Sequence, residues 1–202
     1  MLEASELECE RGGKKLFRGL SFTVRGGERL RIGGANGSGK TSLLRILCGL
    51  LSPNAGEVRW QGAPIGRLRE EYSRQLVYLG HAPAVKDDLT AVENLGIACR
   101  LAGMPLPEEG VREALARLGV PEALFIRRLS QGQRRRAALA RLALSPEVPL
   151  WLLDEPYAAL DAQATGIVDG LIEGQVARGG SVVFTTHQKA GAGAARVIEL
   201  HA

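Results

Sequence analysis

Glycines, a lysine and hydroxyl residues follow one another between positions 34 and 42 at a spacing that suits phosphate binding. Glycines let backbone N–H groups turn inward around phosphate oxygens, and a helix beginning at Lys40 would direct its positive end to the same place. Lys40 would reach the β- and γ-phosphates, and the Thr41 hydroxyl would bind Mg²⁺. This pattern predicts a nucleoside triphosphate site without distinguishing a kinase, a GTPase and a transport ATPase. The candidate nucleotide-binding residues are Gly34, Ala35, Asn36, Gly37, Ser38, Gly39, Lys40, Thr41 and Ser42.

Two carboxylates follow the apolar run Leu150–Leu153, which is typical of a buried strand. A carboxylate at the end of a strand beside a phosphate loop can hold Mg²⁺, usually through water, and we assign this part to Asp154. Glu155 follows directly, where it can face an attacking water as a general base. An isolated Asp-Glu pair would more simply be a solvated strand end, but the phosphate loop upstream favours the catalytic interpretation.

A second helix start with anion-binding chemistry lies at Leu129–Gln133. The Ser130 hydroxyl can cap the helix, and Gly132 allows another group to approach the backbone closely. A helix N-terminus of this kind is a second anion site, although an ordinary capped helix has the same residue types. Its position shortly before Asp154 favours the functional interpretation.

The elements that must position these residues alternate between strand-like and helix-like, which predicts an α/β fold with a mainly parallel sheet. Thr90 and Ser130 each precede a Glu or Gln by three residues, the pattern of a capping box. The expected strands are Leu2–Cys9, Leu20–Val24, Arg29–Ile32, Glu57–Gln61, Leu76–Leu79, Pro149–Leu153, Ser181–Thr185 and Val197–Leu200. The expected helices are Lys40–Leu50, Thr90–Leu101, Val111–Leu118, Ser130–Leu144 and Asp161–Arg178, with a turn at Gly191–Ala195.

The stretch from about 83 to 145 is mostly helical, and we expect it to form a small lobe inserted into an α/β core. The chain would then be a single domain over residues 1–202. Its core would comprise residues 1–82 and 146–202.

The motifs together resemble those of the ATP-binding-cassette (ABC) family. Leu129–Gln133 is similar to the LSGGQ signature of that family, with Gln131 in place of the first glycine. Ala159–Asp161 is similar to its D-loop, and Thr185–His187 is similar to its switch-histidine segment. The motifs occur in the family's order, and the resemblance covers nearly the whole chain.

The resemblance implies an ATP-hydrolysing P-loop NTPase with a RecA-like core, an antiparallel β lobe and a helical lobe, and with ATP and Mg²⁺ as its ligands. The family works as two copies arranged head to tail, with ATP between the phosphate loop of one copy and the signature helix of the other. Asp161 would then belong to the D-loop that crosses between the copies, and His187 would contact the γ-phosphate and help to orient the attacking water. By the same resemblance, the residues that would contact ATP held by the second copy are Ser130, Gln131, Gly132 and Gln133.

Two positions depart from the family pattern. Arg11 stands in place of the adenine-stacking aromatic residue, and because a guanidinium can also stack on a purine, ATP remains the expected nucleotide. His81 stands in place of the Q-loop glutamine and could keep the coupling role of that loop through a ring nitrogen. His81 could instead bind a metal or heme, but a lone histidine without a partner ligand favours the coupling role.

Four segments are similar to one branch of the family, the ATP-binding subunits of heme exporters that serve cytochrome c maturation. These segments are Leu16–Phe22, Gly80–Pro83, Leu129–Arg136 and Thr185–Gln188. The resemblance implies an integral membrane permease as the partner of this chain and a second copy of the chain itself.

Composition limits where the chain would act. Its 202 residues are 45% hydrophobic and carry a net charge of +4. No apolar run reaches the roughly 18–20 residues that cross a bilayer, and the polar, acidic N-terminal segment does not suit a signal peptide. We therefore expect a cytoplasmic protein that is peripheral on the cytoplasmic face of the inner or cell membrane.

Two other functions stay open: a soluble ABC ATPase that acts on ribosomes or nucleic acid, and a nucleotide-gated regulatory module without turnover. Arg127, Arg128 and Arg134–Arg136 could suggest nucleic acid, but no aromatic residues are interleaved with them for base stacking. We expect these arginines to lie on a solvated or partner-facing helix, and we expect no nucleic-acid partner. Glu155 and His187 argue against a module without turnover.

Overall fold

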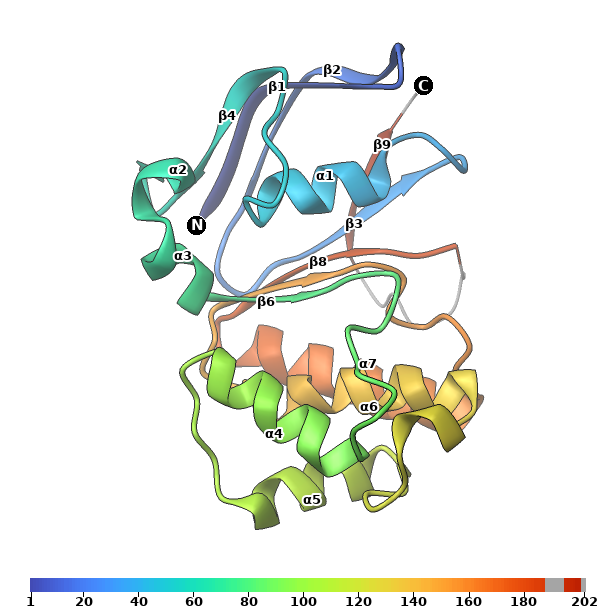
Figure 1. Ribbon diagram of the computed structural model, residues 1–202. Coiled ribbons are helices and arrows are strands. Elements are labelled where there is room, and N and C mark those ends of the chain that lie inside the picture. The colour runs from blue at the N-terminus through green and yellow to red at the C-terminus, as the bar shows by residue number, and fades with distance from the viewer. Residues whose placement is uncertain (188–194, 201–202) are drawn as a thin grey trace.

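Five parallel strands form the central sheet, in the order β6-β7-β8-β3-β9 (Figure 1). The computed structural model of the chain describes residues 1–187 and 195–200, so Gln188 and most of the predicted turn at 191–195 lie outside the described residues. Strands β7 and β8 are buried along their whole length, because a parallel strand covered on both faces must be apolar throughout. The strands are β3 (Arg29–Gly34), β6 (Leu76–Leu79), β7 (Leu150–Leu153), β8 (Ser181–Thr185) and β9 (Arg196–Leu200).

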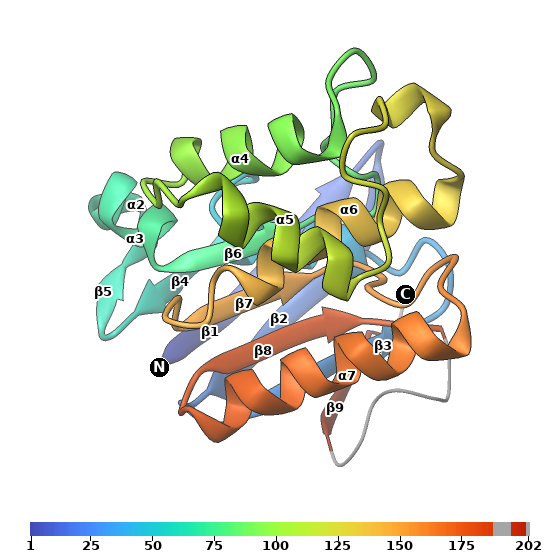
Figure 2. The same cartoon turned by 90° about the horizontal axis from the view of Figure 1, so that it is seen from below.

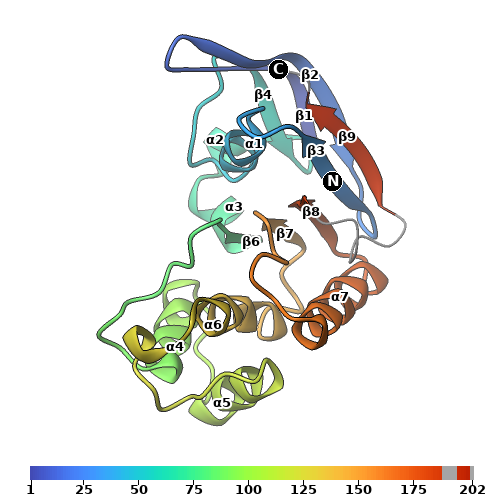
Figure 3. The ribbon, with the colours of Figure 1, turned by 90° about the vertical axis from the view of Figure 1, so that its right-hand side faces the viewer.

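A second sheet has four antiparallel strands in the order β2-β1-β4-β5. Helix α1 (Lys40–Leu47) lies between this sheet and the parallel sheet (Figures 1 and 3). Leu43, Leu44 and Leu47 of α1 are fully buried there, and burying each of them contributes about 1.5–3 kcal/mol. The strands are β1 (Leu2–Arg11), β2 (Lys14–Val24), β4 (Ala55–Trp60) and β5 (Ala63–Pro64).

Helices α6 and α7 pack on the other face of the parallel sheet, and α4 and α5 pack against α6 (Figure 2). Trp151 and Phe184 of the sheet are fully buried against them. The predicted α/β fold with an additional antiparallel sheet is thereby confirmed. The helices are α4 (Ala91–Leu101), α5 (Glu108–Arg117), α6 (Gln131–Ala143) and α7 (Ala162–Ala177).

The predicted helix starts at Thr90, Ser130 and Asp161 are confirmed by their caps, whereas α5 begins at Glu108 and not at the predicted Val111. The Thr90 hydroxyl accepts a hydrogen bond from the Glu93 N–H, and the Glu93 carboxylate accepts one from the Thr90 N–H, which is a complete capping box. Ser130 and Gln133 form the same reciprocal pair at the start of α6. Asp161 caps α7 through its carboxylate.

Other boundaries differ from the sequence prediction. Strand β2 begins at Lys14, not at Leu20, because backbone pairing with β1 extends it through polar residues that show no alternating pattern. Helix α1 ends at Leu47, not at Leu50, because Gly49 takes a left-handed φ of 76° just beyond it. Three short helices were not predicted, namely α2 (Ile65–Leu68), α3 (Glu70–Arg74) and the 3₁₀ turn Ile126–Arg128.

Within residues 1–187 and 195–200, no helix combines the length and the apolar character that a membrane span requires.

Candidate functional site

The predicted phosphate-binding loop connects the end of β3 to the start of α1, and two of its glycines are required by geometry. Gly34 has a φ of 132°, and a Cβ atom there would lie 2.6 Å from Ser38 Oγ and 2.7 Å from the Leu200 carbonyl oxygen. Gly39 has a φ of 101°, and a Cβ atom there would lie 2.9 Å from Leu16 Cβ. Any side chain at either position would open the loop, so its tight curvature depends on glycine.

Lys40 and Ser38 supply the polar side chains inside this loop. The Lys40 side chain is buried, and its ammonium donates hydrogen bonds to the carbonyl oxygens of Gly34 (2.8 Å) and Ala35 (2.9 Å). Ser38 is 1% exposed, and its Oγ forms no hydrogen bond among the described residues. A buried hydroxyl without a partner is uncommon in folded proteins. A ligand with oxygen atoms would satisfy this hydroxyl and the lysine together.

Asp154 joins the phosphate-binding loop to the carboxylates at the end of β7. Its Oδ2 accepts a hydrogen bond from Thr41 Oγ1 (2.8 Å), and its Oδ1 accepts one from Thr185 Oγ1 (2.8 Å). Asp154 is 1% exposed. Three segments that are distant in sequence therefore meet at one buried carboxylate. Thr41 and Asp154 together present the hard oxygen ligands that Mg²⁺ prefers.

Glu155 has a strained backbone that is held in place. Its φ is 51°, a left-handed conformation that is unfavourable for a residue with a side chain. Its N–H donates to Thr185 Oγ1 (2.9 Å), and its Oε2 accepts a hydrogen bond from the His187 N–H (3.2 Å). The His187 ring nitrogen Nε2 lies 3.4 Å from Glu155 Oε1, a buried oxygen that accepts no hydrogen bond from the described part of the chain. The predicted pair of Glu155 and His187 is thus in direct contact.

Arg135 is the site residue that the sequence prediction missed. It is 4% exposed, so the predicted solvated or partner-facing character of Arg134–Arg136 is wrong at this position. Its guanidinium donates to the carbonyl oxygens of Gly80, His81, Asp154 and Glu155. Burial lowers the pKa of Arg135, while the nearby Asp154 and Glu155 carboxylates raise it. A signal was present in the sequence, because Arg135 lies four and seven residues before two leucines of the buried stripe of α6.

A cleft of about 480 Å³ brings most of the candidate residues together. His81, in the Q-loop position, lines it beside the carboxylates and His187. Arg11 does not line it and is exposed at the end of β1. Asp161 and the signature residues also lie outside its lining. The residues that line the cleft are Leu16, Asn36, Gly37, Gly39, Lys40, Thr41, Ser42, His81, Asp154, Glu155 and His187.

The signature segment packs against the segment that precedes Asp161. A Cβ atom at Gly132 would lie 2.9 Å from the carbonyl oxygen of Ala159, which itself has a φ of 60°. Gln131, the residue that departs from the family signature, is exposed at the first position of α6. The start of α6 and the 159–161 segment therefore form one continuous surface.

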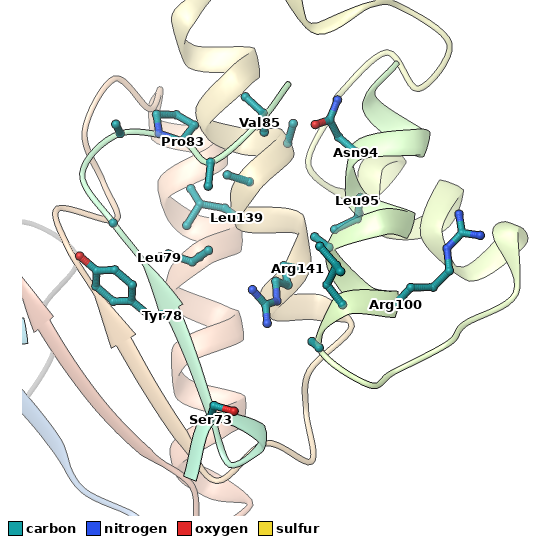
Figure 4. Close-up of a pocket in the computed structure, with 18 of the residues that line it drawn as sticks. Ser73, Tyr78, Leu79, Pro83, Val85, Asn94, Leu95, Arg100, Leu139 and Arg141 are labelled. Carbon is teal, nitrogen blue, oxygen red and sulfur yellow. The ribbon is translucent and has the colours of Figure 1, made fainter. Parts of the chain in front are cut away.

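A larger groove of about 690 Å³ lies between β6, α4 and α6 (Figure 4). Its lining is mixed apolar and basic, and Figure 4 shows Leu95, Leu139 and Arg141 at its walls. The Arg141 Nε atom is buried without a hydrogen-bond partner among the described residues. Burial is the main cause that raises the pKa of Tyr78, which lines the same groove. Gly80 and Arg135 border both this groove and the network at the cleft.

Comparisons with known proteins agree with this geometry. The model of the ABC transporter family matches residues 17–158. The cytochrome c biogenesis ATP-binding export protein CcmA of Aromatoleum aromaticum is 53% identical over 192 residues, which cover 94% of this chain and 90% of that relative.

Two solved structures have the same fold. The ATP-binding subunit of an ABC transporter superposes with a TM-score of 0.87 at 26% identity, over 99% of this chain and 85% of that chain. The dimeric structure of a bacterial ABC transporter cassette superposes with a TM-score of 0.85 at 24% identity, over 99% of this chain and 94% of that chain.

The chain therefore belongs to the ABC transporter family, is one of its ATP-hydrolysing cassettes, and falls with the CcmA group of cytochrome c biogenesis proteins.

Proposed function

We propose that this chain is the ATP-hydrolysing subunit of a membrane complex that exports heme for cytochrome c biogenesis. The relative from Aromatoleum aromaticum is a cytochrome c biogenesis export protein, and it supports the process because about half of the residues are identical along nearly all of both chains. Heme as the exported compound rests on the resemblance of the four segments described above.

The observation that carries the proposal is the hydrogen-bonded line from Thr41 through Asp154 and Thr185 to Glu155. It joins the phosphate-binding loop to the general-base candidate in one cleft. We assign the triphosphate of ATP to residues 34–42, where Lys40 would exchange its bonds to loop carbonyls for bonds to phosphate oxygens.

Mg²⁺ fits the residues that are present. The Thr41 hydroxyl and the Asp154 carboxylate are 2.8 Å apart and are both oxygen ligands, so these two residues would hold the ion. When bound, Mg²⁺ would neutralise part of the charge on the β- and γ-phosphates.

For hydrolysis we assign Glu155 as the general base and His187 as the residue that orients water and contacts the γ-phosphate. The backbone of Glu155 is held by Thr185, and its carboxylate lies against His187, so the base is positioned before substrate arrives. Such positioning lowers the barrier because no reorganisation is needed at the moment of reaction.

We propose that the cleft is completed by a second copy of the chain. Ser130, Gln131, Gly132 and Gln133 lie outside the lining of the cleft in their own chain, which supports a role toward ATP held by the partner. Asp161 would lie at the same interface, and the dimeric cassette structure of the same fold supports this arrangement.

Arg11 would stack on adenine. His81 would couple the cleft, which it lines, to the neighbouring groove, because Gly80 and Ala82 on either side of it line that groove.

The groove between β6, α4 and α6 is our proposed docking site for a cytoplasmic segment of an integral membrane permease. We propose that residues 83–145 act as a lobe that moves relative to the core of residues 1–82 and 146–202. The chain would then be cytoplasmic and peripheral on the inner face of the membrane. Leu101 is 85% exposed and lines the groove, which an apolar partner would cover.

Replacing Glu155 by Gln tests the hydrolytic assignment. We expect turnover of Mg-ATP to fall by about 10²–10⁴-fold, while ATP affinity is retained and an ATP-dependent dimer accumulates in light scattering. Glu147→Gln, at an exposed position, is the matched control. Unchanged turnover in Glu155→Gln would remove Glu155 from this role, and a parent chain that binds ATP without any turnover would favour the regulatory module.

Co-purification from detergent-solubilised membranes tests the partner. The variant Leu101→Glu should lose the permease, while Leu50→Glu, also exposed but outside the groove lining, should retain it. Retention of the permease by Leu101→Glu would contradict docking at the groove. Recovery of ribosomes or nucleic acid in place of a multi-spanning protein would favour the soluble alternative.

The adenine assignment has its own test. The variant Arg11→Ala should weaken ATP binding, measured by fluorescence titration, because a stacking surface is lost. Unchanged ATP affinity in Arg11→Ala would contradict stacking on adenine.

A further inference from the structure

One buried side chain, Arg135, joins two segments that are distant in the sequence. Its Nη1 donates to the carbonyl oxygens of Gly80 (2.7 Å) and His81 (3.1 Å). Its Nη2 donates to the carbonyl oxygens of Asp154 (2.6 Å) and Glu155 (2.8 Å). Each of the two nitrogens therefore holds one segment, and all four acceptors belong to the main chain.

The neighbouring arginines of α6 do not behave in this way. Arg134 has a side chain that is 31% exposed and pairs with Asp87 at 2.9 Å. Arg136 is half-buried, and its Nη1 atom lies near Gly119. Arg135 alone of the three occupies the buried stripe of the helix, where an apolar residue would normally lie. A buried guanidinium needs hydrogen-bond acceptors, and the two terminal nitrogens of Arg135 find them, while its Nε has no acceptor among the described residues.

The segments that Arg135 joins border both the cleft and the groove described above. Asp154, Glu155 and His81 line the nucleotide cleft, while Gly80 and Arg135 line the groove between β6, α4 and α6. A displacement of the 80–83 segment at the groove would therefore be transmitted to the main chain of Asp154 and Glu155 through the guanidinium of Arg135.

The contact to Glu155 matters most, because the backbone of Glu155 is strained. Its φ of 51° persists only if the surrounding structure holds it. The Glu155 N–H donates to Thr185 Oγ1, and the Glu155 carbonyl accepts from Arg135 and from the Ala158 N–H. Arg135 thus supplies a side-chain hydrogen bond to the peptide group that follows Glu155, and Thr185 supplies one to the peptide group that precedes it.

We propose that Arg135 is a positioning residue for ATP hydrolysis, which fixes the backbone of Asp154 and Glu155 against the Gly80–His81 loop. The proposal rests on the role of Glu155 as general base. A lysine cannot replace this arginine, because one ammonium cannot reach four carbonyls with the planar, forked geometry of a guanidinium.

The test compares Arg135→Lys and Arg135→Gln with the control Arg136→Lys in the full-length chain. For both Arg135 variants we expect kcat for Mg-ATP to fall by about 10- to 100-fold, since a displacement of about 1 Å at a catalytic group has that effect. The KM for ATP should stay within about twofold of the parent, because the phosphate-binding loop makes no contact with Arg135. The control should keep the kcat of the parent.

The rate is expressed per chain that binds ATP, measured by nucleotide titration, so that a partly unfolded variant still gives a decisive kcat. A fall in the ATP-binding fraction at unchanged kcat per binding chain would show a merely structural role and overturn the proposal. A rise in KM at unchanged kcat would also overturn it. Failure of the general-base assignment is distinguishable, because Glu155→Gln would then keep its turnover whatever Arg135 does.

Discussion

The hydroxyl of Thr185 is the smallest group whose removal should disturb the whole site. Thr185 is fully buried, donates to Asp154 Oδ1 at 2.8 Å and accepts from the Glu155 N–H at 2.9 Å. Replacement by valine keeps the shape of the side chain and deletes only these two hydrogen bonds. The change therefore isolates the polar contribution from the packing contribution.

The expected cost follows from the two partners left behind. A hydrogen bond to a charged group contributes about 1.5–3 kcal/mol, and a buried N–H without an acceptor costs about 1–3 kcal/mol. For Thr185→Val we therefore expect a loss of about 2.5–6 kcal/mol in the free energy of unfolding. We also expect a fall in kcat, because the strained backbone of Glu155 loses the hydrogen bond that its N–H donates.

The assay is urea denaturation followed by circular dichroism, together with turnover of Mg-ATP. Thr185→Ser is the matched control, since it keeps the hydroxyl and removes one buried methyl group, which costs about 1 kcal/mol. If Thr185→Val proved as stable and as active as Thr185→Ser, the hydrogen bonds that connect Thr41 to Glu155 would not be needed to position Glu155 for hydrolysis.

Three further predictions follow from the geometry. Gly34→Ala should weaken ATP binding by tenfold or more in a nucleotide titration, since its Cβ would meet oxygens within 2.7 Å, whereas Gly37→Ala, which meets nothing within 4 Å, should weaken binding less. Thr90→Ala should lower the free energy of unfolding by about 1 kcal/mol through loss of a cap, and an unchanged urea midpoint would contradict this. Burial raises the pKa of Asp169 above its ordinary value of 3.8, although the hydrogen bond from Tyr157 opposes this shift. The folded protein therefore favours the protonated carboxyl group, and this contribution to the free energy of unfolding is lost as pH rises through the raised pKa. Asp169→Asn should therefore raise the melting temperature at neutral pH and leave it unchanged at a pH below 3.8, and a constant difference across pH would contradict this sign.

Local sequence rules were sufficient where a structural feature depends on neighbouring residues. Thr90, Ser130 and Asp161 cap helices through partners three residues away, so the sequence predicts them directly. The curvature of the phosphate-binding loop is likewise encoded by its own glycines.

Sequence rules failed where a structural feature depends on tertiary contacts. Arg135 is a charged residue in a run of arginines, and only the packing of α6 against two loops shows why it is buried. Strand β2 extends to Lys14 because β1 pairs with it, which no pattern of apolar residues indicates. The contact of Thr185 with Asp154 spans 31 positions and depends on the order of strands in the sheet, so motifs alone could not give it.

The close approach of Gly132 to the Ala159 carbonyl has a consequence for mutational scans. Position 132 is restricted to glycine by a contact inside its own chain, whether or not a second copy is present. Loss of activity after substitution at Gly132 therefore does not by itself measure pairing between copies. Gln131 is adjacent to Gly132 and exposed, so a substitution there changes the outward-facing surface with far less effect on internal packing. The activity of variants at position 131 is therefore a better measure of pairing between copies.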